Sequence, residues 1–294
     1  MLGRRQTRAS ITAGSAVIGA MAVVIGAAVL ALLLTAAAFS TGSEPVFTAY
    51  IAKVTRFTLL QAVLSTLLSV AVAIPLARAI ARRQSFFGRR LLLRLLAVPI
   101  GLPPIVAALG LLEIWGRQGV INSALTGLGM AEPISIYGLA GILIAHVFFN
   151  MPLATRLLLA QLDRVPAEHW RNAGQLGLGP WMVFRLIEWP FMRSHLAAVG
   201  GLVFMLCVTS FTLVLLLGGG PAATTIEVAI YQALRFDFDP QRAVILALIQ
   251  ILLTAFLLSL LVLIGGAPEE DATLGQPPRQ FPGRGWTARL CDYG

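Results

Sequence analysis

The chain has 294 residues, of which 57% are hydrophobic and only 12% are charged. Soluble domains carry roughly 25% charged residues, so this composition excludes an ordinary water-soluble globular protein. The net charge of +9 does not indicate a nucleic-acid-binding protein, because the arginines stand between apolar segments, as in membrane proteins. Neither Cys207 nor Cys291 has the spacing of a metal ligand, and we expect two free thiols.

Six apolar segments are long enough to cross a bilayer, which requires about 20 residues each. In chain order they lie at about 13–38, 55–80, 91–115, 136–160, 195–217 and 241–264. The first is longer than the roughly 7–15-residue apolar core of a cleaved signal peptide, so we expect a retained span. The predicted fold class is an all-α, polytopic membrane helical bundle of six transmembrane helices.

The positions of the basic residues predict the orientation of this bundle. Five of the 22 Lys and Arg residues fall on one side of the predicted spans, namely Lys53, Arg56, Arg117, Arg235 and Arg242. The others fall on the opposite side, which the positive-inside rule makes cytoplasmic. Because the number of spans is even, both termini are expected in the cytoplasm of a bacterial cell, with the chain in the inner membrane.

Composition also divides the chain into three parts. Residues 1–54 are expected to form an N-terminal cytoplasmic arm, the first span and an outer loop, and residues 55–264 the transmembrane domain. Residues 265–294 contain four prolines and no apolar run, which is typical of a cytoplasmic linker or tail with little fixed structure.

The longest predicted cytoplasmic loop, residues 161–194, is the most informative segment. Residues 166–176 are compatible with a helix, and the proline that begins them suits a first helical turn. The glycines within 177–179 interrupt this helix. A second short helix is predicted over 180–188, ending before Pro190.

This loop resembles the signature loop of permeases of ATP-binding cassette (ABC) importers. That pattern is Glu-Ala-Ala, three residues, Gly, nine residues, and Ile-x-Leu-Pro. Here Arg171-Asn172-Ala173 stands at the triplet, and Gly177, Ile187 and Pro190 keep the spacing. The chain departs from the pattern at Arg171 and Asn172, and Trp189 replaces the Leu.

The resemblance implies that the loop couples the permease to a partner ATPase. The chain has no phosphate-binding Gly-x-x-x-x-Gly-Lys-Ser/Thr motif, so ATP hydrolysis is expected in that partner. Ala173 is expected to lie against the ATPase, and Gly177 to permit the turn through a positive φ. The alternative is an interfacial helix and turn without a coupling role. The candidate coupling residues are Trp170, Arg171, Asn172, Ala173, Leu176, Gly177, Ile187 and Pro190, with Trp170, Leu176 and Phe184 as apolar anchors.

A second resemblance lies in GGGPAATTIEVAIYQAL (218–234) and the following Asp237-Phe238-Asp239-Pro240. These stretches are similar to permeases of thiamine and thiamine pyrophosphate importers, over at least residues 50–265. Such permeases usually fuse two homologous six-span halves, and this chain is similar to the first half and the start of the linker. Permeases for ferric iron, sulfate or polyamines are the alternatives within the class.

The resemblance to importer permeases also implies the partners. They are ABC ATPase subunits, a periplasmic substrate-binding protein, a second permease half (fused, separate or a second copy), thiamine or a related small molecule, and membrane lipid. No cofactor and no nucleic acid are expected.

Polar residues within the spans are candidates for the translocation path, because such groups usually face the bundle interior or a water-filled path. His146 and Asn150 lie in the fourth span. They either line the path or form hydrogen bonds between helices. The prolines within 99–104 either open a cavity in the third span or simply kink it.

On the outer side, Glu227 is a third candidate for the path. Together with Asp237 and Asp239 it either attracts a cationic ligand or contacts the binding protein, or it belongs to a solvated loop. The turn at 218–221 is either a mobile gate or a tight surface turn.

An intramembrane enzyme and a non-transport membrane protein are the remote alternatives. The three histidines lie on different segments, and the chain contains no His-Glu-x-x-His or Gly-x-Ser-x-Gly motif. A non-transport membrane protein would not explain the spacing of the cytoplasmic loop.

Overall fold

The computed structural model describes residues 19–32, 34–35, 49–83, 85–129 and 134–265. Within these residues the chain is helical and contains no strand. The helices are α2 (Ala49–Arg82), α3 (Arg89–Leu95), α4 (Val98–Gly101), α5 (Pro104–Trp115), α6 (Val120–Gly127), α7 (Leu139–Leu162), α8 (Ala167–Gln175), α9 (Pro180–Val183), the π-turn Phe184–Glu188, α10 (Trp189–Val208), α11 (Thr212–Leu217), the short 3₁₀ turn Pro221–Ala223, α12 (Ile226–Arg235) and α13 (Pro240–Gly265).

The all-α membrane fold is confirmed. Five helical segments among the described residues are long and apolar enough to cross a membrane, namely Ala49–Arg82, Pro104–Gly127, Leu139–Leu162, Pro180–Val208 and Pro240–Leu261. The predicted first span is described only in part, as the apolar helix Gly19–Leu32. The predicted linker or tail after residue 265 lies outside the described residues. The boundary expected at residue 54 falls inside α2, which begins at Ala49.

The third predicted span, 91–115, is not one helix. Pro99 lies in the first turn of α4, and Pro103 and Pro104 stand at the start of α5. Leu102, directly before them, is extended with ψ 128°, as expected for a residue that precedes proline. The segment that meets the length of a span begins at Pro104 and continues to Gly127.

The prediction that a helix ends before Pro190 is wrong. Pro180–Val208 forms one continuous helical segment. Proline has no N–H to donate in a helix, but the wider π-turn directly before it accommodates this loss. Within that turn the Trp189 N–H reaches back five residues to the Phe184 carbonyl. The helical segment that contains the fifth span therefore starts about fifteen residues before the predicted span.

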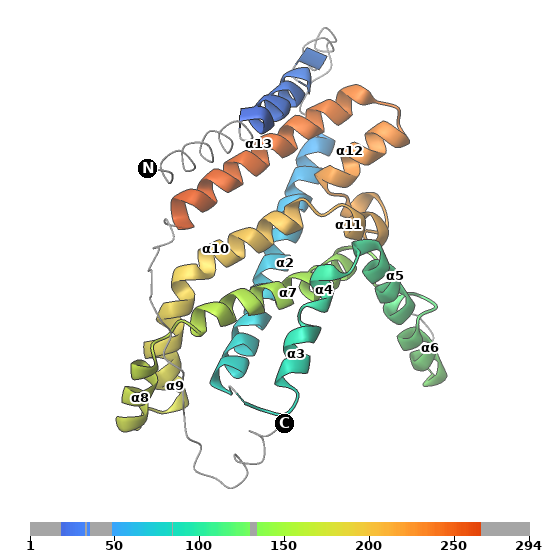
Figure 1. Cartoon of the computed structure of the whole chain (residues 1–294). Coiled ribbons are helices and arrows are strands. Elements are labelled where there is room, and N and C mark those ends of the chain that lie inside the picture. The colour runs from blue at the N-terminus through green and yellow to red at the C-terminus, as the bar shows by residue number, and fades with distance from the viewer. Residues whose placement is uncertain (1–18, 33, 36–48, 84, 130–133, 266–294) are drawn as a thin grey trace, which may run out of the picture.

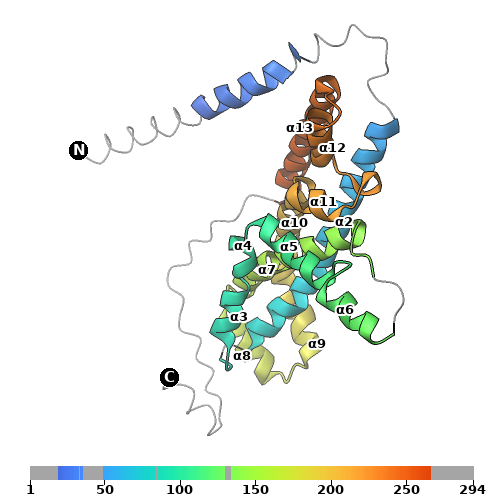
Figure 2. The ribbon, with the colours of Figure 1, turned by 90° about the vertical axis from the view of Figure 1, so that its right-hand side faces the viewer.

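Helix α7 is the centre of the bundle. Half of its most apolar window is buried, against 11% for α13. It packs along α2, where the fully buried Ala73 and Ala77 allow the helices to approach closely. Helix α10 packs against both α2 and α7, and α13 packs against α10. Figures 1 and 2 show α8 and α9 at one end of the bundle and α12 at the other.

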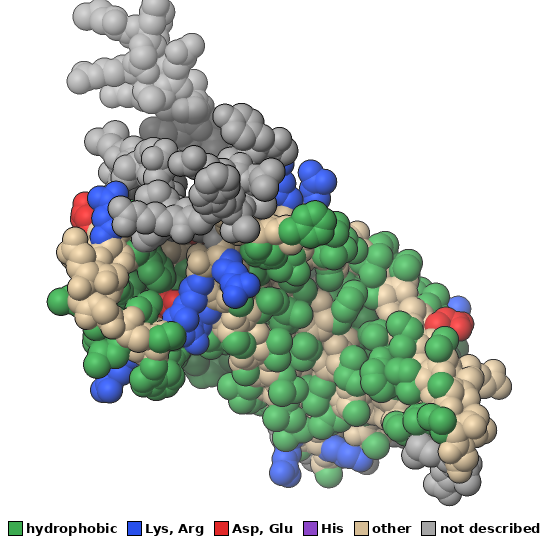
Figure 3. Space-filling model, turned by 90° about the horizontal axis from the view of Figure 1, so that it is seen from below, with side chains coloured by type: hydrophobic (Ala, Val, Ile, Leu, Met, Phe, Trp, Pro, Cys, Tyr) green, Lys and Arg blue, Asp and Glu red, His purple; other side chains and the backbone are tan. Residues whose placement is uncertain are grey.

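The outside of the bundle is apolar, as a lipid-facing surface requires. Exposed large hydrophobic residues occur on every long helix, for example Leu67 on α2 and Phe256 on α13. Figure 3 shows one face on which hydrophobic side chains predominate, with Lys and Arg side chains in several places. Polar groups instead gather inside, where α2 buries Thr58, Gln61 and Ser65.

Candidate functional site

The cytoplasmic loop predicted to couple an ATPase contains the expected pair of helical elements. Helix α8 ends in a Schellman motif, in which the Leu178 N–H donates to the Ala173 carbonyl at 3.0 Å and the Gly177 N–H to the Gly174 carbonyl at 3.3 Å. Gly177 has φ +61°, which confirms the positive φ expected there. This conformation carries a penalty for residues with a Cβ, so the glycine sets the angle between the two elements.

Ala173 is not on the surface of the loop, and the expectation that it faces a partner must be corrected. This residue is 5% exposed and belongs to a small core with Val165 and Ile187. Trp170 and Leu178 pack on this core and are partly buried. The small side chain is needed here because α8 lies directly on the chain that follows it.

The exposed part of the loop consists of other residues. Arg171 and Asn172 are exposed, and so is Leu176, a residue that is 73% exposed. Sequence reasoning missed the further exposed apolar residues, which are Trp181, Met182 and Leu186. Phe184, predicted as an anchor, is partly buried against the main core instead. The exposed apolar edge of the loop is therefore formed by Leu176, Trp181, Met182 and Leu186.

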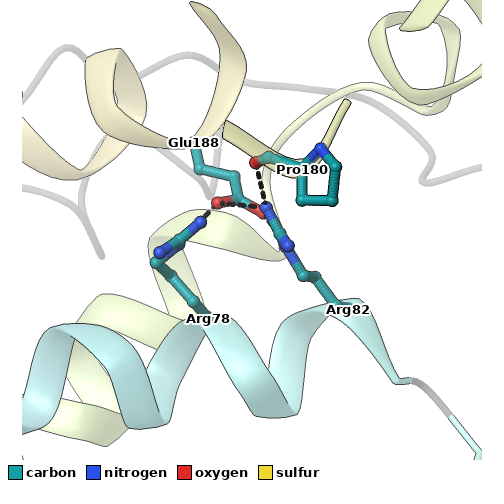
Figure 4. A network of polar contacts seen from close by, with 4 residues as sticks. All are labelled: Arg78, Arg82, Pro180 and Glu188. Atoms are coloured by element: carbon teal, nitrogen blue, oxygen red, sulfur yellow. Dashed lines mark hydrogen bonds and ion pairs between the residues drawn. The ribbon is translucent and has the colours of Figure 1, made fainter. Parts of the chain in front are cut away.

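The Ile187 and Pro190 positions of the motif flank a buried carboxylate that sequence reasoning also missed. The Glu188 side chain is 1% exposed and accepts hydrogen bonds from Arg78 Nε at 2.7 Å and Arg82 Nε at 2.6 Å. Arg82 Nη2 also donates to the Pro180 carbonyl at 2.9 Å. Figure 4 shows both arginines reaching from α2 to this carboxylate. An i,i+4 pair of arginines at the end of an apolar helix was the available signal.

The other part of the site is a half-open pocket between α7, α10 and α11, with a volume of about 640 Å³. It forms where α10 ends at Val208 and the chain turns before α11 begins at Thr212. Both path candidates from the fourth span line it, and the turn supplies hydroxyl groups and an aromatic ring. The residues that line it are Ile100, Pro104, His146, Phe149, Asn150, Leu153, Leu202, Leu206, Thr209, Ser210, Phe211, Thr212 and Leu213.

Hydrogen bonds join the pocket wall to α2. Ser65 Oγ lies 2.9 Å from His146 Nδ1, and Gln61 Nε2 donates to the Cys207 carbonyl at 2.9 Å. Asn150 Nδ2 donates to Cys207 Sγ at 3.2 Å. His146 and Asn150 thus form hydrogen bonds between helices and also line the pocket, while their place on a translocation path stays a prediction.

This network leaves two buried polar atoms unused. His146 Nε2 and Gln61 Oε1 have no hydrogen-bond partner among the described residues. The His146 side chain lines the pocket with only 1% of the residue exposed. A buried polar atom without a partner costs free energy, and such atoms recur where a ligand or water is accommodated. The pocket is therefore the candidate binding region of this chain.

Glu227, the third path candidate, does not line this pocket. It lies in the first turn of α12, is half-buried, and accepts a hydrogen bond from Gln250 Nε2 of α13 at 3.1 Å. Burial raises the pKa of this carboxyl, and the Gln250 hydrogen bond offsets part of the rise. Asp237 and Asp239 pair with Arg242 at 2.8 and 3.3 Å, so both carboxylates already have a cation beside them.

The glycines near 218–221 form a tight turn. Gly219 and Gly220 have φ +68° and +131°, conformations that favour glycine. The Gly138 N–H donates to the Leu217 carbonyl at 2.8 Å, which ties the end of α11 to the start of α7. Among the described residues no three His, Cys, Asp or Glu side chains gather in a way that could hold a metal ion.

Comparison with known proteins identifies relatives that align with most of this chain. The chain is 52% identical over 280 residues to the thiamine transport system permease protein ThiP of Brucella abortus (strain 2308), covering 95% of this chain and 52% of that protein. It is 49% identical over 243 residues to the protein of the same name from Escherichia coli (strain K12), covering 83% of this chain and 45% of that one. The chain thus spans about half the length of the curated relatives it matches.

Solved structures show the same fold. A bacterial ABC transporter involved in the import of the acidic polysaccharide alginate matches with a TM-score of 0.61 and 15% identity, over 75% of this chain and 82% of that one. The alginate transporter in complex with its alginate pentasaccharide-bound periplasmic protein matches with a TM-score of 0.62 and 14% identity, over 73% and 77%. At these identities the likeness concerns the fold.

A family model supplies the classification. The model described as "Binding-protein-dependent transport system inner membrane component" matches residues 73–266, which include the loop, its arginine contacts and the pocket. The described part of the chain contains five candidate membrane spans. The chain belongs to the family of binding-protein-dependent transport system inner membrane components and is a multi-pass protein of the inner membrane.

Proposed function

We propose that this chain forms one half of the translocation path of an ABC importer for thiamine or its phosphates. The observation that carries the proposal is the pocket between α7, α10 and α11, where His146 and Asn150 meet a break in a membrane helix. High identity to proteins named as thiamine transport system permeases supports the substrate class.

The chemistry of the pocket favours this substrate over the alternatives. None of the described side chains that line it is charged, so this half offers no carboxylates to a ferric ion or a polyamine and no cation to sulfate. Its lining includes the rings of Phe149 and Phe211, the Asn150 amide and the His146 imidazole. Aromatic faces attract cations and stack on planar rings, which suits a thiazolium joined to a pyrimidine.

We assign the proposed protein partners to the two ends of the bundle. Two ABC ATPase subunits would dock at the cytoplasmic loops, one of them beneath residues 161–194, and hydrolyse the ATP. A periplasmic binding protein would deliver substrate at the α12 end, and a second permease half would complete the path. The surrounding lipid would contact the apolar exterior, and no cofactor is required. The relatives are named as permeases, which supports a transport rather than an enzymatic role.

We also propose that the α8–α9 end and both termini are cytoplasmic, because most arginines lie on that side. Cysteine labelling tests this orientation at Arg83, which is exposed just after α2, and at Leu128, which follows α6 and is 83% exposed. A cysteine at Arg83 should react only from the cytoplasm and one at Leu128 only from the periplasm. The reverse pattern would contradict the orientation.

The substrate is tested by uptake of labelled thiamine in cells that cannot synthesise it and that carry the complete importer. Asn150→Ala removes a pocket amide and should lower uptake by on the order of tenfold, the size of a lost buried hydrogen bond. The matched control is Ser259→Ala, which removes a polar group that bonds only within α13. Growth that follows iron or sulfate supply instead would refute the thiamine assignment. Equal uptake in both variants would refute the role of the pocket.

A further inference from the structure

The buried carboxylate at the base of the loop belongs to a contact between two helix faces. Arg78 and Arg82 lie one turn apart on α2. Opposite them, positions 180, 184 and 188 lie on one face of the segment that leads into α10. Arg82 donates to the Pro180 carbonyl, and the Arg78 guanidinium lies 3.9 Å from the centroid of the Phe184 ring.

Both arginines also meet at the Glu188 carboxylate. Each carboxylate oxygen accepts from at least one guanidinium, with Arg82 contributing a second donor at 3.2 Å. Charge-assisted, multidentate contacts of this kind fix orientation more strictly than apolar packing does. We call the set Arg78, Arg82, Pro180, Phe184 and Glu188 the arginine clamp.

The burial of the clamp is informative. Glu188 is 1% exposed on its side chain, whereas Arg78 and Arg82 are 23% and 31% exposed. Apolar residues of similar volume often stabilise a protein as well as a buried ion pair or better, so an ion pair is weak as a device for stability alone. An ion pair of this kind does fix the position of α2 relative to the segment that leads into α10. Such a fixed contact suits two segments that must move together.

Helix α2 connects the clamp to the pocket. Its 34 residues form one continuous helix, about 50 Å long, with Pro75 between the two sites. Beyond Pro75, Ser65 contacts His146 on the pocket wall, and Gln61 holds the Cys207 carbonyl beside the break in α10. The same helix therefore touches the base of the loop and the wall of the pocket.

We propose that Glu188 is a positioning residue that makes the loop and α2 move as one body, so that a push on the loop reaches the pocket through α2. The inference rests on the proposed docking of an ATPase beneath the loop. It assigns no contact with ATP or substrate to Glu188. The rival explanation is that the clamp only neutralises a buried charge.

The first test needs no partner. Spin labels on cysteines at Arg83 and Trp181 report the distance between α2 and the loop in the full chain in lipid nanodiscs. Cys291 is replaced by Ser, and Cys207 is buried and stays unlabelled. The parent chain should give one narrow distance distribution, and Glu188→Gln a clearly broader one. The matched control is Glu168→Gln, an exposed acid on the same loop, which should leave the distribution unchanged.

The second test uses the assembled importer. Glu188→Gln should still co-purify with the ATPase to within about twofold of the parent, because the exposed edge of the loop is intact. Uptake should fall by about tenfold or more, and stimulation of ATP hydrolysis by the loaded binding protein should fall with it. Arg82→Lys keeps the positive charge but loses the planar set of guanidinium donors, and it should show an intermediate loss of uptake. This variant replaces Glu188→Gln in the test if Glu188→Gln does not fold.

Two results would overturn the proposal. An unchanged distance distribution in Glu188→Gln would mean that the clamp does not hold the loop to α2. Normal uptake together with a broadened distribution would mean that transport does not depend on that hold. If the parent chain itself fails to recruit the ATPase, the proposed function fails, while the distance measurement still decides whether the clamp joins the two segments.

Discussion

The two polar regions of this bundle differ in how completely their groups are paired. In the arginine clamp both oxygens of Glu188 accept hydrogen bonds, and Arg82 also serves the Pro180 carbonyl. Beside the pocket, His146 and Gln61 each use one polar atom and leave the other without a partner among the described residues. The hydrogen bonds of the Glu188 carboxylate are all made within the clamp, whereas buried polar atoms next to the pocket are left without partners.

This difference suggests that the arginine clamp and the pocket have different roles. Unpaired polar groups at membrane depth are costly, and they are tolerated where a path or cavity admits water or ligand. The contacts of a buried carboxylate with cations resist separation, because breaking them leaves a charge buried without its partner. The clamp therefore holds α2 and the loop in one relative position, whereas the pocket can bind and release a ligand. The largest loss of stability is therefore expected at the clamp, and smaller effects are expected at the turn of the loop and at Glu227.

The largest effect is expected for Glu188→Ala. The change leaves two guanidinium groups facing each other without their carboxylate, and it should lower the free energy of unfolding by about 3 kcal/mol. The measurement is thermal unfolding in detergent or nanodiscs. Glu168→Ala, at an exposed position of α8, should change the same quantity by less than about 0.5 kcal/mol. If Glu188→Ala and Glu168→Ala lowered the free energy of unfolding equally, the clamp would not stabilise the protein more than an exposed position of the same loop does.

A smaller effect is expected at the turn of the loop. Gly177→Ala places a Cβ on a residue with φ +61° and should destabilise the protein by about 1–2 kcal/mol. Gly174→Ala replaces a helical glycine and should instead stabilise it by roughly 0.5–1 kcal/mol. A Cβ at either position meets no atom within 4 Å, so the two changes differ only in backbone conformation.

Thermal unfolding of the two glycine variants provides the comparison. If Gly177→Ala proved as stable as Gly174→Ala, the left-handed turn would not be what fixes the loop, and the clamp alone would remain to do so. Recruitment of the ATPase should follow the same order as stability.

The smallest effect concerns Glu227, which has an amide rather than two arginines as its partner. Burial raises the pKa of this carboxyl above its ordinary value of 4.5. The folded state therefore keeps the proton to higher pH than the unfolded state does. The resulting stabilisation is complete below pH 4.5 and is lost as the pH rises through the raised pKa.

The pH profile of thermal unfolding measures this contribution. Glu227→Gln should flatten the part of the profile just above pH 4.5, whereas Glu168→Gln should leave it as in the parent. A parent profile that rises with pH in this window and does not change in Glu227→Gln would contradict the assignment.

The sequence predicted the features that depend on neighbouring residues. Apolar runs overlap the five described candidate spans, although the third and fifth predicted spans start at the wrong residues, and a glycine after a helical pattern located the turn at Gly177. Pro190 misled the prediction, because a proline ends an ordinary helix but can follow a π-turn. The burial of Ala173 was missed since it depends on how α8 folds back on Ile187.

The contacts that define the site join residues far apart in the chain. Glu188 meets arginines 110 and 106 positions away, and Gln61 bonds a carbonyl 146 positions away. Hydropathy and spacing describe only one segment at a time, so no pattern in a single sequence could pair these residues. His146 and Asn150 were found because a polar residue inside an apolar run is visible locally.

The π-turn at Phe184–Glu188 also bears on how the length of this segment can change during evolution. A turn of this type contains one more residue than the α-helical turn it replaces. Deleting a single residue within it would restore ordinary winding and rotate the preceding face of the loop by about 100° relative to α10. Connecting segments usually tolerate insertions and deletions, but here one residue decides whether Pro180 and Glu188 face the same helix.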